Sequence, residues 1–157
     1  MDDEIFIAKY IAGKVDTDDL VEFANKKLAS GVYSDHLLNI LDETPKVWVP
    51  ISNYFEKAVI DLGYEIPSFD DAIWVLVKYH ITLISKGNVC PAKQFQEMLK
   101  DIERFSLHDG IKEYVGDNIG ISRMYAWYHE DHCSPEQIDS EIFEESLKWV
   151  LEYSEKH

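Results

Sequence analysis

Hydrophobic residues recur along most of this chain at the spacing of one face of an α-helix. Leu20, Phe23, Ala24 and Leu28 stand at positions i, i+3, i+4 and i+8, among acidic and basic residues. Such spacing indicates an amphipathic helix, whereas a half-buried strand would alternate apolar and polar residues. No alternation of strands with helices indicates a parallel sheet. The pattern therefore predicts an all-α fold.

Residues favoured at helix ends divide the chain into segments. A capping Ser or Thr or a first-turn Pro precedes most apolar runs, and Gly follows several of them. In the first half, the predicted helices are Asp3–Ala12, one capped by Thr17 and ended by Gly31, one capped by Ser34 that runs through Leu41, and one that has Pro50 as its first residue and is ended by Gly63. The later predicted helices are one capped by Ser68 that starts at Phe69, one that starts at Pro91, Ser122–Glu130, and one from Pro135 to about Lys156. Ser106–Gly120 is predicted to hold a short helix and a loop, because three glycines interrupt it.

The segment Ala72–Ile84 is apolar nearly all round a helix, which is typical of a buried helix. Its β-branched and aromatic residues would also suit a buried strand. The length of the segment, the Ser68 cap and the following Gly87 favour a helix. We therefore expect residues 1–157 to form a single helical domain, a bundle of about six to eight helices around the buried central helix Ala72–Ile84.

The chain is strongly acidic, with 15 Lys and Arg against 30 Asp and Glu, a net charge of −15 on 157 residues. Nucleic-acid phosphates and anionic lipids are bound through Lys and Arg, so we expect no direct nucleic-acid binding and no membrane binding. A negative surface instead steers a protein toward a basic protein partner. The alternative is that the charge serves solubility alone.

The N-terminal residues and the cysteines indicate the compartment. Met1–Glu4 is acidic, whereas signal and transit peptides carry basic residues. The longest apolar stretch, Ala72–Ile84, is too short and too polar to span a bilayer. Cys90 and Cys133 form no Cys-x-x-Cys motif and are too few for a disulfide scaffold. These features predict a reduced, cytoplasmic protein.

Two acidic clusters are candidate surfaces for a basic partner. One side of the last predicted helix is acidic and opposes a wide apolar arc. The residues proposed to bind the partner are Glu141, Glu144, Glu145 and Glu152 on this helix and, as a second cluster, Asp16, Asp18 and Asp19. Both clusters also have an ordinary explanation, since exposed helix faces are solvated and acids near a helix start complement its dipole. The apolar arc is a candidate contact for a homodimer.

Two tryptophans are candidate contact residues. Trp48 stands in Val47-Trp48-Val49 between two prolines, and Trp127 stands beside Tyr125 and Tyr128. Trp and Tyr contribute most of the binding energy at many protein interfaces. The alternative is that these rings belong to the core.

A candidate metal site lies at His129, His132 and Cys133, since imidazole and thiolate groups bind zinc. A helical zinc-protease motif places its histidines at i and i+4, whereas these stand at i and i+3. The alternative is a polar helix end, with His near the C-terminal dipole. His80, within the apolar helix, is expected to be a core histidine with satisfied hydrogen bonds, and Cys90 a semi-buried thiol. The sequence has no phosphate-binding loop and no nucleophile-elbow motif, so we expect no cofactor and name no catalytic residue.

The run from Ile84 to Pro91, which joins two predicted helices, resembles a feature of small uncharacterised bacterial helical proteins. Tyr114-Val115-Gly116, the aromatic and acidic stretch after it and the acidic last helix are similar to them too. In size, charge and helicity the chain resembles the immunity proteins that neutralise bacterial toxins, many of which are basic nucleases. The resemblance covers the C-terminal half and carries no binding residue over. It implies a role in blocking a partner.

The expected function is that of a non-enzymatic, acidic protein-binding domain, an inhibitor or immunity protein that occludes a basic toxin or nucleic-acid-binding partner. Acidic side chains would pair with the cationic surface of the partner, and aromatic residues would supply the desolvated contact. Two alternatives stay open. One is a small metal-dependent enzyme that uses the cluster from His129 to Cys133, and the other is a regulatory subunit that dimerises through the last helix.

Overall fold

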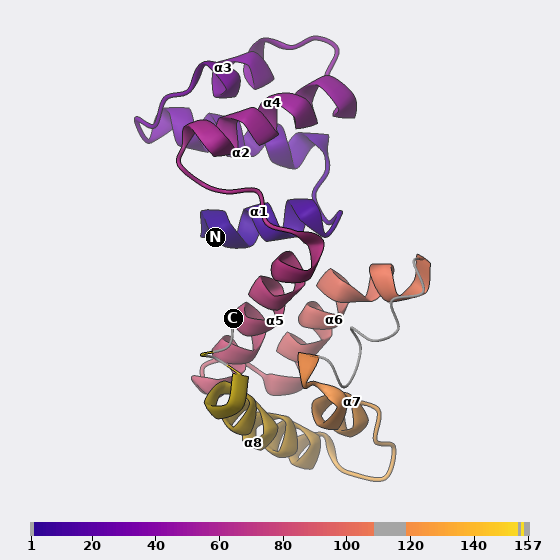
Figure 1. Cartoon of the computed structure of the whole chain (residues 1–157). Helices are drawn as coiled ribbons and strands as arrows, with labels where there is room; N and C mark the ends of the chain where they lie inside the picture. Colours follow the sequence, from indigo (N-terminus) through magenta and orange to yellow (C-terminus); the bar gives the residue numbers. More distant parts are fainter. Residues whose placement is uncertain (1, 109–118, 154, 156–157) are drawn as a thin grey trace. The chain divides into compact units, whose positions relative to one another are not determined.

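The computed structural model describes residues 2–108, 119–153 and 155 of the chain. Within these ranges the structure has eight α-helices and no strand (Figure 1). The helices are α1 (Asp3–Ile11), α2 (Thr17–Ala29), α3 (Asp35–Asp42), α4 (Trp48–Asp61), α5 (Phe69–Ser85), α6 (Pro91–His108), α7 (Ser122–Tyr128) and α8 (Pro135–Tyr153). The prediction of an all-α fold is confirmed. None of the helices in the described ranges combines the length and the apolar run that a bilayer crossing requires.

The chain divides into two compact units. Unit 1 contains Met1–Ala12 and Phe69–His157, and unit 2 contains Gly13–Ser68. Unit 2 is therefore inserted in the sequence between α1 and α5 of unit 1. The expectation of a single domain over residues 1–157 stays a prediction.

Helix α5 is the centre of unit 1. Helices α1, α6 and α8 pack against it, and α7 packs against α8 (Figure 1). One face of α5 is buried, and its residues are Ala72, Ile73, Leu76, Val77, His80, Ile81 and Ile84. Residues spaced by three or four positions lie on one side of a helix, whereas in a strand residues three positions apart lie on opposite faces. The buried central helix is thus confirmed, and the strand alternative is wrong.

The other side of α5 is less buried than its apolar sequence indicates. Trp74, Val75, Tyr79 and Leu83 are only half-buried, although a helix that is apolar all round is typically enclosed. The reason is that, among the residues that the structure describes, the neighbouring helices leave part of the circumference of α5 uncovered, and these side chains line a groove. The half-buried apolar stripe on α5 therefore results from the packing of the helices and is not apparent from the sequence pattern.

Unit 2 is built from α2, α3 and α4, which pack against one another. Its core includes Leu20, Leu37 and Ile40, all of them inaccessible to solvent. The rings of Phe23 in α2 and Phe55 in α4 meet edge to face, with centroids 5.3 Å apart and an interplanar angle of 80°, an arrangement that aromatic pairs prefer. The apolar residues that recur at helical spacing in these three segments therefore pack together as a small core.

Several helix starts lie where the sequence predicts them. Ser34 caps α3, since its hydroxyl accepts a hydrogen bond from the His36 N–H at 3.1 Å. Ser134 stands before α8 and accepts from the Gln137 N–H at 3.2 Å. Helices α5 and α6 begin at the predicted Phe69 and Pro91. These starts are confirmed because capping depends on residues within one turn.

Two predicted helix starts are wrong by one or two residues. The cap of α2 is Asp16 rather than Thr17, because Asp16 and Asp19 form a capping box in which each carboxylate accepts from the other residue's N–H at 2.9 Å. Helix α4 begins at Trp48, so Pro50 is its third residue rather than its first. Proline is tolerated there because the first-turn N–H groups have no partner within the helix.

The segment predicted as a short helix and a loop, Ser106–Gly120, is described only in part. Its first three residues belong to α6, which continues to His108, and residues 109–118 lie outside the described residues. Helix α8 is described to Tyr153, whereas the sequence predicts an end at about Lys156. Residues 154, 156 and 157 also lie outside the described residues.

Candidate functional site

Three consecutive apolar residues are exposed at the start of α4 and form what we term the apolar tip: Val47, Trp48 and Val49. Their exposed fractions are 47%, 39% and 68%. A single exposed hydrophobic residue needs no explanation, but a contiguous group of them marks an interaction surface. Of the two alternatives for Trp48, a core ring or a contact residue, the structure places it at the surface.

Hydrogen bonds hold the apolar tip on both sides. The Lys46 ammonium donates to the carbonyl oxygens of Ile40 and Leu41, at 2.8 and 2.6 Å. It thereby satisfies two terminal carbonyls of α3 and complements the helix dipole. On the other side, the Ser52 hydroxyl donates to the Val49 carbonyl oxygen at 3.1 Å. Lys46 was not predicted as a functional residue, although a lysine just after a helix is a signal for such capping.

The aspartates near α2 are partly committed to the helix itself. The carboxylates of Asp16 and Asp19 accept the capping-box hydrogen bonds. Asp18 is exposed in the first turn, where its charge is also favourable to the helix dipole. Of this predicted cluster, Asp18 is therefore the carboxylate most available to a partner.

The acidic face of α8 is uneven. Glu144 and Glu152 are exposed, while Glu141 is half-buried. The side chain of Glu145 is only 12% exposed, and its carboxylate lies 3.4 Å from the Lys148 ammonium. Glu144 and Glu152 are thus the two members of this set that present their charge to solvent.

The predicted dimer contact on α8 also has exposed apolar residues. Leu147 is 37% and Leu151 is 86% exposed, and the two stand one helical turn apart. Ile142 and Trp149, from the same apolar arc, are buried in unit 1 instead. The homodimer stays a prediction.

Trp127, the second candidate contact residue, lies in α7 of unit 1. It is half-buried and packs against the core of that unit. Trp127 therefore contributes to the core and is also partly accessible at the surface, whereas Trp48 belongs to a run of exposed residues.

The predicted metal ligands follow α7. The His129 ring is exposed and lies edge-on to the rings of Tyr125 and Tyr128, with centroids 4.4 and 5.0 Å away. The backbone N–H of His132 donates to the Glu130 carboxylate at 3.0 Å. Over the described part of the chain, which includes His132 and Cys133, no three His, Cys, Asp or Glu side chains are grouped so as to hold a metal ion.

His80 is a core histidine with satisfied hydrogen bonds, as the sequence predicts. It is 3% exposed. Its Nε2 lies 2.6 Å from Asp101 Oδ2 in α6, and its Nδ1 lies 2.7 Å from Gln94 Nε2. Both ring nitrogens are thereby hydrogen-bonded within unit 1, and the pair links α5 to α6.

Cys90 is more exposed than the predicted semi-buried thiol. Its sulfur lies 3.7 Å from Asp139 Oδ1 in α8, and the same carboxylate oxygen accepts a hydrogen bond from the Ala92 N–H at 2.9 Å. The arrangement ties the start of α6 to α8.

Ser34, His36 and Asp61 have the residue types of a hydrolytic triad, and their contact was not predicted from the sequence. Asp61 is the central member: its Oδ2 lies 2.6 Å from both the Ser34 hydroxyl and the His36 Nδ1. In a catalytic triad the histidine is central and takes the serine proton. Here the serine donates to the aspartate, so the group fastens the start of α3 to the end of α4 in unit 2 and is not a nucleophilic site.

This contact predicts a specific pH dependence. Hydrogen bonds from the Ser34 hydroxyl, and next from His36, hold the pKa of Asp61 below the usual value of an aspartate. The unfolded chain then binds more protons, so the contribution of Asp61 to stability is fully present above about pH 4 and is lost as the pH falls through the folded-state pKa. We expect Asp61→Asn to be less stable than the wild type at pH 7, and we expect this difference in stability to shrink as the pH falls below about 4.

Urea denaturation between pH 3 and pH 7 measures this difference. Asp42→Asn is the matched control, because Asp42 is an exposed carboxyl in α3 of the same unit. A stability difference between Asp61→Asn and the wild type that does not change with pH would contradict the prediction.

No family model, no curated protein and no solved structure matches the chain.

Proposed function

We propose that this chain is a non-enzymatic protein-binding domain that blocks a basic protein partner, in the manner of an inhibitor or immunity protein. The observation that carries the proposal is the apolar tip, held by hydrogen bonds from Lys46 and Ser52, on a chain of net charge −15. A tip that is ordered before binding lowers the entropy cost of association.

The distribution of exposed hydrophobic residues supports unit 2 as the binding unit. Eight large hydrophobic residues are exposed in the described part of the chain, and six of them belong to unit 2. These six are Tyr33, Leu38, Val47, Trp48, Val49 and Ile60. Exposed apolar area of this kind costs solubility unless a partner covers it, and tryptophan is among the residues most often found at the energetic centre of an interface.

Exposed carboxylates in unit 2 indicate that the proposed partner is basic. Asp42 is exposed at the end of α3, five residues before the apolar tip begins, and Asp18 is exposed in the same unit. Such carboxylates steer a positively charged surface toward the tip and speed association. The partner we propose presents an apolar recess surrounded by Lys and Arg, and binding covers its cationic surface. We place the complex in the cytoplasm, where the two free cysteines stay reduced.

The test compares capture by the wild type with capture by Trp48→Ala. Proteins bound from a cell extract at low and high salt are identified, and one that is rich in Lys and Arg and released by salt is purified. We expect Trp48→Ala to raise its dissociation rate at least about tenfold, because the tryptophan supplies desolvated contact. We expect Asp42→Lys with Asp18→Lys to slow association, because steering depends on charge.

Leu151→Ala is the matched control, since Leu151 is 86% exposed but belongs to α8 in unit 1. It lies outside the proposed binding unit, so we expect this variant to bind as the wild type does. Equal dissociation rates for Trp48→Ala and the wild type would rule out the apolar tip as the binding site.

A further inference from the structure

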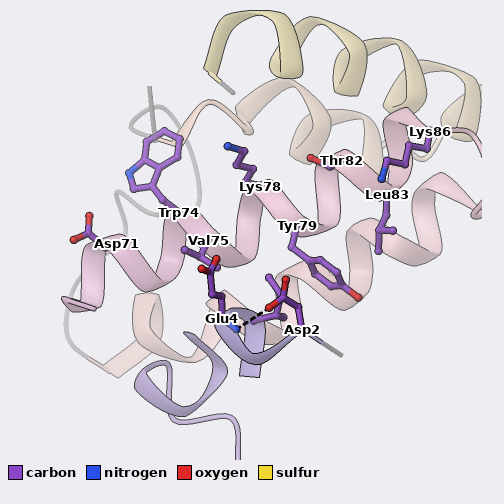
Figure 2. Close-up of a pocket in the computed structure, with 11 residues that line it drawn as sticks. Asp2, Glu4, Asp71, Trp74, Val75, Lys78, Tyr79, Thr82, Leu83 and Lys86 are labelled. Atoms are coloured by element: carbon purple, nitrogen blue, oxygen red, sulfur yellow. Dashed lines mark hydrogen bonds between the residues drawn. The ribbon is translucent and has the colours of Figure 1, made fainter. Parts of the chain in front are cut away.

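A second surface, in unit 1 and independent of the apolar tip, has the form of a helix-binding groove. It has a volume of about 610 Å³ and lies along the half-buried stripe of α5, beside the start of α1 (Figure 2). Ile5, Val75 and Leu83 give it an apolar lining. The volume is that of an ordinary ligand site, but the groove is long and open to solvent.

Two rows of side chains run along this side of α5, each with a step of four residues. The first row is Asp71, Val75, Tyr79 and Leu83, and the second is Trp74, Lys78 and Thr82, continued by Lys86 directly after the helix. Figure 2 shows the second row along one edge of the groove and the first row closer to α1. Rows of this kind are the ridges between which a ridge of another helix packs, in the commonest class of helix packing. From Asp71 to Lys86 the rows extend about 22 Å, which is about four helical turns.

The two edges of the groove carry opposite charges. Lys78 and Lys86 lie on the edge away from α1 (Figure 2). Asp2 and Glu4 lie on the α1 side, where the Asp2 carboxylate caps the helix by accepting the Glu4 N–H at 3.0 Å. A helix with matching charges on both sides of its apolar stripe would meet an opposite charge along each edge, as in paired coiled-coil helices.

Trp74 is held in place before any partner arrives. Its ring lies 6.2 Å from the Trp149 ring and 6.0 Å from the Tyr153 ring, both in α8. An aromatic side chain fixed in this way loses little freedom on binding, and tryptophan is the side chain most enriched at binding hot spots.

From the two ridges, the opposite edge charges and the fixed indole, we propose that the groove between α1 and α5 binds an amphipathic helix of another protein. The apolar stripe of that helix is flanked by Lys or Arg on the side that meets Asp2 and Glu4, and by Glu or Asp on the side that meets Lys78 and Lys86. This is the helix-in-groove mode of peptide recognition.

Three synthetic peptides test the proposal. Each has about 16 residues and the same apolar stripe at helical spacing. The first has Lys along one side of the stripe and Glu along the other, the second has Glu on both sides, and the third has Lys on both sides. We expect fluorescence anisotropy at physiological salt to show that the mixed peptide binds the full-length protein at least about tenfold more tightly than the Glu peptide and more tightly than the Lys peptide.

Protein variants separate recognition in the groove from attraction to an acidic protein. Lys78→Glu with Lys86→Glu makes both edges acidic, so we expect the preference to change from the mixed peptide to the Lys peptide. Leu83→Glu should weaken binding of the mixed peptide at least about tenfold. Leu147→Glu is the matched control, because Leu147 is a 37% exposed leucine on α8 that does not line the groove. We expect this variant to bind the mixed peptide as the wild type does.

Circular dichroism of each variant shows whether it has folded. The proposal is overturned if the mixed peptide binds no more tightly than the Glu peptide, or if folded Lys78→Glu with Lys86→Glu keeps the wild-type preference. It is also overturned if folded Leu83→Glu binds the mixed peptide as the wild type does.

Discussion

Replacement of His80 by leucine is expected to lower the free energy of unfolding by about 2–4 kcal/mol. His80 is 3% exposed and uses both ring nitrogens, toward Asp101 and toward Gln94. Leucine fills much of the space but donates no hydrogen bond. The Asp101 side chain, 13% exposed, then retains the Lys9 ammonium at 3.9 Å but loses its hydrogen bond to the imidazole. Urea denaturation followed by circular dichroism measures the loss.

The double variant His80→Leu with Asp101→Leu tests the physical reason. Loss of one partner leaves a buried polar group unsatisfied, whereas loss of both removes the need for the hydrogen bond. We therefore expect the double variant to be more stable than the sum of the two single effects predicts, by about 1–3 kcal/mol. If the losses in free energy of unfolding of the two single variants add up to that of the double variant, the His80–Asp101 hydrogen bond does not contribute to the stability of unit 1.

Replacement of Gly120 by alanine is expected to cost about 3 kcal/mol of stability, from two sources. The φ angle of Gly120 is +73°, a conformation that costs an L-residue about 1–2 kcal/mol. A Cβ atom at this position would lie 2.5 Å from Cε2 of Tyr153, and such overpacking adds about 1–3 kcal/mol. Tyr153 stacks on Trp149 at 5.4 Å, and the Trp149 indole donates to the Ile119 carbonyl at 2.8 Å. Displacement of Tyr153 would therefore disturb the packing of α8 on α5.

Gly63→Ala is the matched control because it has the same backbone strain without the steric contact. Its φ angle is +90°, and no atom outside its chain neighbours lies within 4 Å of the position that a Cβ would occupy. We expect a loss of about 1 kcal/mol in thermal or urea denaturation. Equal losses for Gly63→Ala and Gly120→Ala would contradict a steric role for Tyr153.

Local features of the fold follow from the sequence because their causes lie within one helical turn. Ser34 and Ser134 cap the helices that they precede. The two wrong starts are also local: Asp16 competes with Thr17 for the role of cap, and Pro50 can occupy any first-turn position. The prediction of Trp48 as a contact residue rests on the same kind of signal, an apolar run between two prolines.

The features that join one helix to another were not predicted. Asp101 and His80 are 21 positions apart, and Asp61 and Ser34 are 27 positions apart. No periodicity relates such residues, because their contact depends on how two helices pack. The groove does have a signal in the sequence: Lys78 interrupts the apolar surface of α5, and Lys86 continues the same row of positions spaced by four, directly after the helix.

Sequence patterns alone predict the all-α fold, the starts of most helices and the central position of Ala72–Ile84, and the net charge of −15 is a property of composition. These properties depend on composition and on residues close together in the chain. Packing between helices, by contrast, leaves the apolar tip exposed, buries most of the Glu145 side chain and leaves one side of α5 open as a groove. Exposure depends on which helices cover a surface, and this depends on contacts between residues far apart in the sequence.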